Sequence, residues 1–350
     1  MKEENINNYF KPREPEGYIK DTTVSPHPIF YGSTDNGLCI EPVEYKNNVD
    51  KQYNELFQKI LDEGEWSDNR TGVRTKSIFG ENIKMDMREG FPIFTSRQMP
   101  FKSFTGELEC FLQGYTSKIE FKERGCNWWQ SWCNPMRVTY GNDPETKLKM
   151  QKEDDLGLIY GAQIRNFSDP KHIEFLPDPF DGSPTIETPV RGIDQLQVMI
   201  DKIRNGIDDR RLIVSMWNPL AFERMALVPC HYAFQVYLSP CGSYLDLMWN
   251  QRSVDLALGA NNTLYGILIH LLAYESGRIP RYLTACYGNV HIYEDQIDIV
   301  KEQLTRPTHK LPTLKIKEWK FDDIYNWTHD CVELVGYQHS GVLKYPQATV

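Results

Sequence analysis

The sequence predicts an α+β fold built around one mixed β-sheet. Segments with the apolar spacing of helices are interleaved with short apolar segments typical of strands. Two of these strands, over 231–238 and 243–250, are separated only by the turn Ser-Pro-Cys-Gly. This combination indicates a mixed α+β domain rather than a regular βαβ repeat.

The elements are predicted in order from residue 49 onward. A helix is expected over 49–64, because Tyr53, Leu56, Phe57, Ile60 and Leu61 share one face. Two short strands broken at Gly80 follow, and then a helix over 104–114 that stops at a glycine. The remaining elements are a helix over 193–205, a strand over 211–217, the two strands above, a buried helix over 264–277, a strand over 281–287 and a helix over 293–304.

Three segments lack this periodicity. Residues 1–48 are polar and rich in Pro, Gly and Asn, which predicts a loop-rich extension ahead of a single domain over 49–350. The stretches 134–155 and 166–193 are also expected to be loop-like, and the second is heavy in Pro, Asp and Gly.

Composition excludes several classes of protein. The 350 residues carry 39 basic and 48 acidic side chains, a net charge of −9, and 40% of them are hydrophobic, as in globular proteins. The acidic balance argues against a general nucleic-acid binder, but a few arginines can still converge on a small anion. No apolar stretch of membrane-spanning length and no signal peptide occur. Eight scattered cysteines without a C-x-x-C pair favour a reducing, cytoplasmic location.

One cysteine has neighbours that suggest chemistry. Cys230 stands between Pro229 and His231 at the start of a strand. A thiol held there can act as a nucleophile if a cation lowers its pKa. A half-buried strand cysteine is the simpler interpretation of this segment alone. A zinc deaminase is not indicated, because the H-x-E and P-C-x-x-C pattern is absent.

Other polar groups are weak signals singly. The run Gln251-Arg252-Ser253-Val254-Asp255 offers an amide, a guanidinium, a hydroxyl and a carboxylate suited to a phosphate ligand, or simply a solvated turn. Glu107 falls near the apolar face of its helix, where a carboxylate is costly unless partnered. Arg70, Arg210 and Arg211 can likewise be either binding-site residues or parts of solvated turns and loops. His291 and Tyr293 are two residues apart, which would put both side chains on one side of a strand or first turn.

Taken in order, these motifs resemble the thymidylate synthase family, which also includes the phage pyrimidine hydroxymethylases. The resemblance covers about residues 69–350. Its motifs are RTGVRTKSIFG, FPIFTSRQMPFKSFTGELECFLQGYTS, DLGLIYGAQIR, DRRLIVSMWNP, PCHYAFQVYL, NQRSVDLALG, GNVHIY and GYQHSGVLKYPQATV. It implies a homodimer whose sheets pack back to back, with dUMP or a related nucleotide and 5,10-methylenetetrahydrofolate as substrates and with no metal. A non-catalytic scaffold ranks last, because the nucleophile and the phosphate arginines are all present.

The resemblance also implies roles for residues. Cys230 would attack C6 of the pyrimidine, with Arg252 against its thiol, Glu107 organising proton transfers and Tyr160 helping to remove the C5 proton. The 5′-phosphate would be held by Arg70, Arg252 and Ser253, with Arg210 and Arg211 from the partner subunit. The base and sugar would meet Gln251, His231, His291 and Tyr293. The folate would meet Asp255, Trp129, Leu258 and Gly259, and the C-terminal Val350 would close over it.

Departures from the family bear on the product. Synthases carry Pro-Phe-Asn after the glycine, and ungapped alignment puts Thr263 at that base-reading Asn, with Asn262 as a substitute if the loop shifts by one residue. Gln130 also stands where synthases usually have Asp. Added polarity at Asn261, Asn262 and Gln130 predicts that water is admitted, which makes dUMP hydroxymethylation the leading hypothesis. The alternative is dTMP synthesis; dCMP is less favoured as substrate, because His231 matches the uracil-handling branch.

Overall fold

The computed structural model describes residues 47–69, 71–169, 192–259, 261–317 and 323–346, and the backbone of two strands at 173–177 and 184–189. Most of the predicted extension over 1–48 lies outside these residues. Its last two residues belong to the domain, because Asn47 caps helix α1 (Asn48–Glu63) by accepting from the Asp50 N–H.

A six-stranded sheet forms the centre of the fold, in the order β1-β2-β8-β7-β6-β5. All neighbouring strands are antiparallel except β7 and β8, which run parallel. The strands are β1 (Glu65–Ser67), β2 (Thr75–Asp86), β5 (Ile213–Ser215), β6 (His231–Leu238), β7 (Tyr244–Asp255) and β8 (Ile279–Tyr293). The sheet is therefore mixed, and the predicted α+β class is confirmed.

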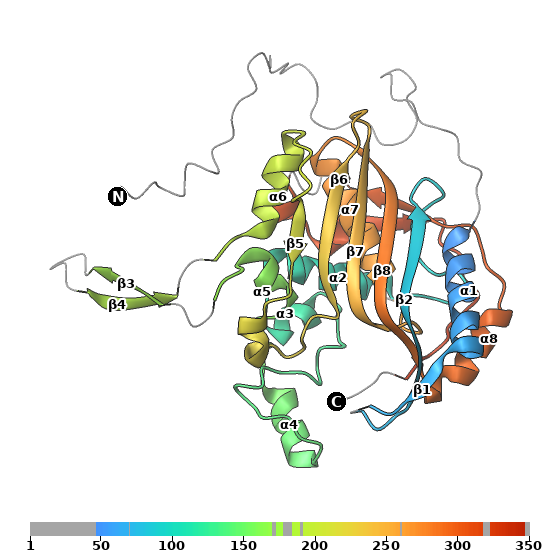
Figure 1. Cartoon of the computed structure of the whole chain (residues 1–350), viewed down its shortest axis with the longest axis horizontal. Coiled ribbons are helices and arrows are strands. Elements are labelled where there is room, and N and C mark those ends of the chain that lie inside the picture. The colour runs from blue at the N-terminus through green and yellow to red at the C-terminus, as the bar shows by residue number, and fades with distance from the viewer. Residues whose placement is uncertain are drawn as a thin grey trace.

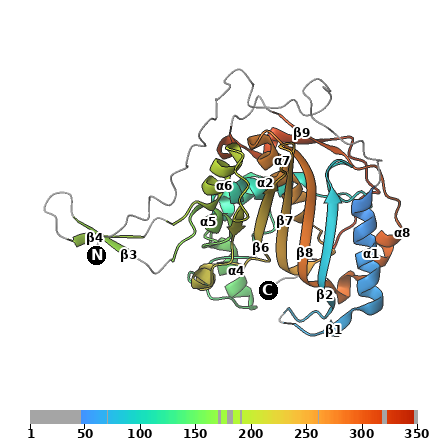
Figure 2. The same cartoon turned by 45° about the horizontal axis from the view of Figure 1, so that its top comes forward.

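Helices cover one face and both edges of this sheet. In Figures 1 and 2, α2 and α7 lie behind the sheet, α1 and α8 flank the β2 edge, and α5 and α6 lie toward the β5 edge. The helices besides α1 are α2 (Phe101–Gln113), α3 (Lys118–Glu123), α4 (Pro144–Lys152), α5 (Tyr160–Arg165), α6 (Gln195–Arg204), α7 (Asn261–Glu275) and α8 (Ile297–Thr305), with short 3₁₀ turns η3 (Pro219–Arg224), η4 (Glu294–Gln296), η6 (Ile324–Asn326) and η7 (His329–Cys331). Among the described residues, no helix has both the length and the apolar character needed to cross a membrane.

Helix α7 makes the crossover between the parallel strands β7 and β8. Its residues from Asn262 to Tyr274 are all buried. A helix packed on every side needs no polar face, which explains why this segment is apolar all round. The helix begins at Asn261, three residues before the predicted start at residue 264.

Several predicted boundaries were wrong. Strand β2 runs unbroken past Gly80, which takes a positive φ of 87° within it. The stretch 134–155 contains α4, capped by Asp143. The stretch 166–193 contains the hairpin of β3 (Ile173–Pro177) and β4 (Pro184–Pro189), which projects from the body in Figures 1 and 2. A second small sheet pairs β9 (Thr313–Ile316) with β10 (Val332–Val335).

The strand directions bring the predicted motifs to one end of the sheet. Because β7 and β8 are parallel, their last residues, Asp255 and Tyr293, finish at the same end. Strand β6 is antiparallel to β7, so its first residue, His231, starts there too. Three motifs distant in sequence therefore meet at one edge.

Candidate active site

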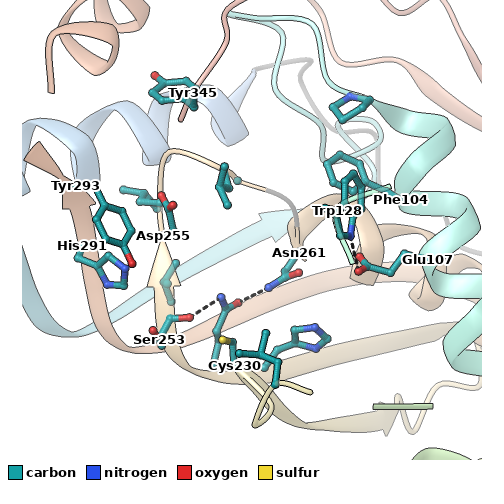
Figure 3. A pocket seen from close by; sticks show the side chains of 18 of the residues that line it. Phe104, Glu107, Trp128, Cys230, Ser253, Asp255, Asn261, His291, Tyr293 and Tyr345 are labelled. Atoms are coloured by element: carbon teal, nitrogen blue, oxygen red, sulfur yellow. Dashed lines mark hydrogen bonds between the residues drawn. The ribbon is translucent and has the colours of Figure 1, made fainter. Parts of the chain in front are cut away.

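A cavity of about 500 Å³ opens at this end of the sheet. That size suits small-molecule ligands. Figure 3 shows Cys230 and Ser253 on its floor, His291 and Tyr293 on one side, Glu107 and Trp128 on the other, and Tyr345 above Asp255. The walls thus combine strand ends, helix α2 and the C-terminal segment.

Cys230 is half-buried and lies one residue before β6. Its backbone N–H donates to the Tyr160 hydroxyl at 2.8 Å, and its carbonyl accepts from the Arg252 N–H at 2.8 Å. The Arg252 guanidinium donates to the carbonyls of Pro229 and Val228, both at 3.0 Å. The chain on either side of the thiol is therefore fixed by hydrogen bonds, and Arg252 is held next to it while remaining exposed.

His231 is buried between aromatic groups. Its ring stacks on Tyr160 with centroids 4.3 Å apart, and its Nδ1 lies 2.9 Å from the Tyr265 hydroxyl. Burial lowers the pKa of His231 to about 3, so the ring is neutral at physiological pH. His231 therefore supplies a hydrogen-bonding group and no positive charge.

Tyr160 starts α5 and lines the cavity behind the cysteine. Burial raises its pKa well above the usual value, so the phenol keeps its proton at neutral pH. Its oxygen accepts the Cys230 N–H, which leaves its own O–H free to donate into the cavity. Tyr160 is thus a fixed neutral hydrogen-bonding group.

Glu107 projects from α2 into the cavity, fully enclosed by protein. The indole N–H groups of Trp128 and Trp129 both donate to its Oε1, at 2.7 and 2.8 Å. Burial raises the pKa of Glu107 to about 7, although the two indole hydrogen bonds favour the charged form. Both protonation states are accessible near neutral pH, and neither indole engages Oε2. This is the arrangement expected of a group that gives and takes protons.

A chain of amides crosses the floor. The Gln251 side-chain N–H donates to the Ser253 carbonyl at 3.0 Å, and its Oε1 accepts from the Asn261 Nδ2 at 2.8 Å (Figure 3). A backbone carbonyl can only accept, so it sets the orientation of Gln251 and, through it, that of Asn261. The Asn261 amide is therefore presented to the cavity in one orientation.

The other residues expected near the base lie elsewhere. Asn262 is buried and donates to the Pro92 carbonyl at 2.8 Å, and Thr263 is fully buried in α7. Neither lines the cavity, and neither does Gln130. Successive helix residues point about 100° apart, so the residue at the helix start faces the cavity and the next two face the core. Asn262 and Thr263 therefore face the core, and Asn261 is the residue of this run that lines the cavity.

Asp255 ends β7 and is partly buried. Its Oδ2 accepts from the Gln296 Nε2 at 3.0 Å, whereas its Oδ1 has no partner among the described residues. Burial raises the pKa of Asp255 to about 6, against the effects of the Gln296 hydrogen bond, of the backbone N–H groups of Leu258 and Ala257, and of Arg97. An unpaired buried acceptor is costly, so Oδ1 is suited to a ligand that carries N–H donors.

The remaining predicted residues divide into two sets. Those that line the cavity, besides Cys230, His231, Tyr160, Glu107, Gln251, Asn261 and Asp255, are Trp129, Leu258, Gly259, Ser253, His291 and Tyr293. At Gly259, which has φ 54°, a Cβ would come within 2.0 Å of Phe94, so only glycine fits. Burial lowers the pKa of His291 to about 4, and its Nδ1 lies 2.8 Å from Asn289 Oδ1.

The second set either does not line the cavity or lies outside the described residues. Arg252 belongs to it, because its guanidinium is bonded to the Pro229 and Val228 carbonyls and does not line the cavity. Arg210 and Arg211 are exposed in the loop before β5, where Arg211 pairs with Asp209 at 3.0 Å. Arg70 and Val350 lie outside the described residues, although Thr71, next to Arg70, lines the cavity.

Several lining residues were not identified from the sequence. Trp128 donates to Glu107, Arg97 donates from Nη2 to the Leu258 carbonyl at 2.9 Å, and the Tyr345 ring lies 4.8 Å from the Arg97 guanidinium. Trp128 and Trp129 are adjacent in the sequence, but only the structure shows that both indoles donate to the same oxygen of Glu107. No group of three potential metal ligands occurs among the described side chains.

The chain is similar to known proteins over most of its length. The family model described as thymidylate synthase matches residues 51–349. The thymidylate synthase of Mycoplasma genitalium is 34% identical over 303 residues, which are 83% of this chain and 96% of that protein. A probable thymidylate synthase of Escherichia phage T5 is 36% identical over 79% of this chain and 90% of its own. The thymidylate synthase of Pseudomonas syringae pv. tomato is 33% identical over 85% of this chain and 99% of its own. The chain therefore belongs to the thymidylate synthase family, whose members are one-carbon transferases that use 5,10-methylenetetrahydrofolate as co-substrate and no metal.

Proposed function

We propose that the protein methylates dUMP at C5 to give dTMP. The observation that carries this proposal is the nature of the cavity walls between Cys230 and Asp255. Aromatic and aliphatic side chains form much of these walls, namely those of Phe104, Phe111, Trp128, Trp129, Trp132, Leu227, Leu258 and Leu343. Such walls exclude water from the reacting carbon, and exclusion favours completion of the reaction by hydride.

The hydroxymethylation hypothesis depended on polar residues that would admit water. Of those residues, Asn262 and Gln130 do not line the cavity, and Asn261 is bonded to Gln251 at its floor. Two of the three polar residues on which that hypothesis rested therefore lie away from the cavity. The names of the relatives also favour synthesis of dTMP.

The residues present fit the folate. Asp255 Oδ1 is a buried acceptor without a partner among the described groups, and Leu258 and Trp129 line the same cavity. These residues would hold its pterin, and the N–H groups of the pterin would satisfy Oδ1. When bound, the folate supplies the one-carbon unit and, for methylation, the hydride.

The nucleotide is activated by the chain's own groups. The Cys230 thiolate adds to C6, forming a C–S bond, and the C5–C6 electron pair moves toward C5 and O4. Glu107, whose pKa of about 7 allows both protonation states, takes and returns the protons this requires. Tyr160 stays neutral and acts by donating its O–H toward the group that takes the C5 proton. C5 thereby becomes the nucleophile that the free base lacks.

Asn261 reads the base in this proposal. Its amide offers one acceptor and one donor, which complement the N3–H and O4 of uracil. The chain from the Ser253 carbonyl through Gln251 sets which way the amide faces. His291 and Tyr293 lie across the floor from it, where the sugar would reach them (Figure 3).

The identity of the reaction product tests the proposal directly. Incubation with dUMP and 5,10-methylenetetrahydrofolate is expected to release one dihydrofolate per nucleotide, followed by absorbance, and to give a product with the mass of dTMP. Formation of 5-hydroxymethyl-dUMP without dihydrofolate would overturn methylation and restore hydroxymethylation.

Base recognition is tested with Asn261→Asp. An ionised carboxylate only accepts, so it repels O4 of uracil and attracts the exocyclic amine of cytosine. We expect kcat/KM for dUMP to fall roughly a hundredfold, with a relative gain for dCMP. The control is Thr263→Ser, which is expected to leave the base preference unchanged because Thr263 is buried in α7. A changed preference in the control, with none in N261D, would return the reader role to Thr263.

We also propose that the active protein is a homodimer in which Arg210 and Arg211 complete the partner's phosphate site. Both arginines are exposed and do not line the cavity of their own chain. The neighbouring residues Ile213 and Tyr237 are about half exposed, at 47% and 43%, on the sheet face opposite the buried Val214 and Val236. That apolar face is available to a second sheet.

Mixing two inactive variants tests this arrangement. Cys230→Ser lacks the nucleophile, and the double variant Arg210→Ala/Arg211→Ala lacks the donated arginines. After subunit exchange, half of the dimers carry one intact site each, so about a quarter of wild-type activity is expected. Absence of any recovery, with dimers and exchange confirmed by sedimentation and mass, would show that each site is built within one chain.

A further inference from the structure

A single buried amide links three parts of the cavity. Gln296 ends η4, directly before α8, and has no exposed surface. Its Oε1 accepts from the Tyr293 N–H at 3.0 Å, and its Nε2 donates to Asp255 Oδ2 at 3.0 Å and to the Pro346 carbonyl at 3.1 Å. Both N–H groups and the carbonyl of the side chain are therefore used.

These three partners belong to different functional regions. Tyr293 ends β8 on the side proposed for the sugar, and Asp255 ends β7 on the side proposed for the folate. Pro346 lies in the C-terminal segment, next to Tyr345, which lies above Asp255 in Figure 3. Because Gln296 holds Asp255 by Oδ2, the other oxygen, Oδ1, is left for a ligand.

A second buried glutamine fastens the same segment without touching Asp255. Gln303 follows Gln296 by seven residues, about two helical turns, so both lie on the same face of the α8 region. Its Oε1 accepts from the Tyr345 hydroxyl at 2.8 Å, and its Nε2 donates to Ser96 Oγ at 3.2 Å. The C-terminal segment is thus held at two consecutive residues, and only one of the two anchors also holds the aspartate.

We propose that Gln296 is a positioning residue of the folate site, which orients Asp255 and by the same amide fixes the C-terminal segment over the cavity. This inference rests on the proposed function. When a ligand pairs with Asp255 Oδ1 and the carboxylate moves, the Gln296 side chain moves with it. The hydrogen bond from Gln296 to the Pro346 carbonyl then transmits this movement to the C-terminal segment.

The charged surroundings of Asp255 give a readout specific to this role. Arg97 faces the carboxylate and favours its charged form, and burial opposes it. Two neutral groups also lie near the Asp255 carboxylate: Tyr345, and His291, which is paired with Asp255 between β7 and β8. Burial raises the pKa of Tyr345 and lowers that of His291, so neither carries a charge at neutral pH. The neighbours of Gln296 in η4, Glu294 and Asp295, are exposed. Removing the Gln296 donor therefore raises the pKa of Asp255 further above about 6.

The test compares Gln296→Met with two matched variants. Gln303→Met removes the second anchor, and Gln58→Met alters an exposed glutamine of α1. For Q296M we expect KM for 5,10-methylenetetrahydrofolate to rise roughly tenfold to a hundredfold, with a smaller change in dUMP affinity. We also expect the acid limb of kcat/KM for the folate to move to higher pH. Q303M is expected to raise KM without moving the acid limb, and Q58M to match the wild type.

A second variant guards against misfolding of the first. Gln296→Glu keeps the size of the side chain and loses the donor when ionised, so its folate defect is expected to be larger at pH 8 than at pH 6. If Q296M and Q296E keep the wild-type folate KM and acid limb, or if Q303M reproduces both effects of Q296M, the positioning role is overturned. If the wild type itself neither converts dUMP nor binds tetrahydrofolate in calorimetry, the proposed function fails instead.

Discussion

Replacement of Cys230 by serine is expected to abolish turnover while leaving the nucleotide bound. A serine hydroxyl is a much weaker nucleophile than a thiolate, and no other thiol lines the cavity among the described residues. We expect kcat to fall by roughly 10³- to 10⁶-fold, as when a covalent nucleophile is removed. Tritium release from C5 of labelled dUMP would fall with it, because the C5 proton leaves only after addition at C6. Affinity for dUMP in calorimetry is expected to change little.

The matched control is Cys241→Ser. Cys241 is exposed in the turn between β6 and β7, where a hydrogen bond with Ser239 lowers its pKa to about 7. It is thus a reactive thiol away from the cavity, and its replacement is expected to leave kcat unchanged. Full turnover in C230S, or loss of turnover in C241S, would contradict the assignment of the nucleophile.

Glu107→Gln is expected to lower kcat by about 10²- to 10⁴-fold, the usual contribution of a general acid–base group. Glutamine still accepts from the indoles of Trp128 and Trp129 through its Oε1, so the local structure is retained. The ionisation near pH 7 in the wild-type kcat profile should disappear in the variant, because Glu107 has a pKa of about 7. An unchanged profile would show that another group titrates there.

The same substitution is expected to stabilise the protein at alkaline pH. The pKa of Glu107 is raised in the folded state, from 4.5 to about 7, so the folded protein binds the proton more tightly than the unfolded chain. Stability from this group is present below pH 4.5 and is lost as the pH rises through about 7. At pH 8 the buried charge costs about 3 kcal/mol, which E107Q avoids. Thermal unfolding of both proteins at pH 5 and pH 8 should show a gap that widens with pH; a constant gap would contradict this explanation.

The sequence was sufficient to identify the residues that carry chemistry in compact motifs. The neighbours of Cys230 and the run from Gln251 to Asp255 are each continuous, so their residue types could be recognised without a structure. The mixed sheet was also predictable, because the turn at 239–242 and the apolar helix between two strands are local signals. These local signals do not show which side chains are hydrogen-bonded to one another in the fold.

Only the tertiary structure decided which of three polar side chains faces the cavity. Asn261, Asn262 and Thr263 are consecutive polar residues, and sequence alignment without a gap favoured the third. Helix α7 begins at the first of them, and its rotation turns the next two into the core. The orientation of Asn261 then depends on the Ser253 carbonyl, a backbone group that no residue type reveals.

The same holds for Trp128 and Gln296. Each acts through one hydrogen bond or a few to residues far away in the chain, Trp128 to Glu107 and Gln296 to Asp255 and Pro346. A tryptophan or a glutamine in isolation has no chemical signature, because both residue types are common in cores and on surfaces. Their importance here comes from burial, which makes each polar contact hard to replace. The sequence alone thus indicated the candidate reactive groups, and the fold determined their partners, their protonation and the side of the cavity that each one faces.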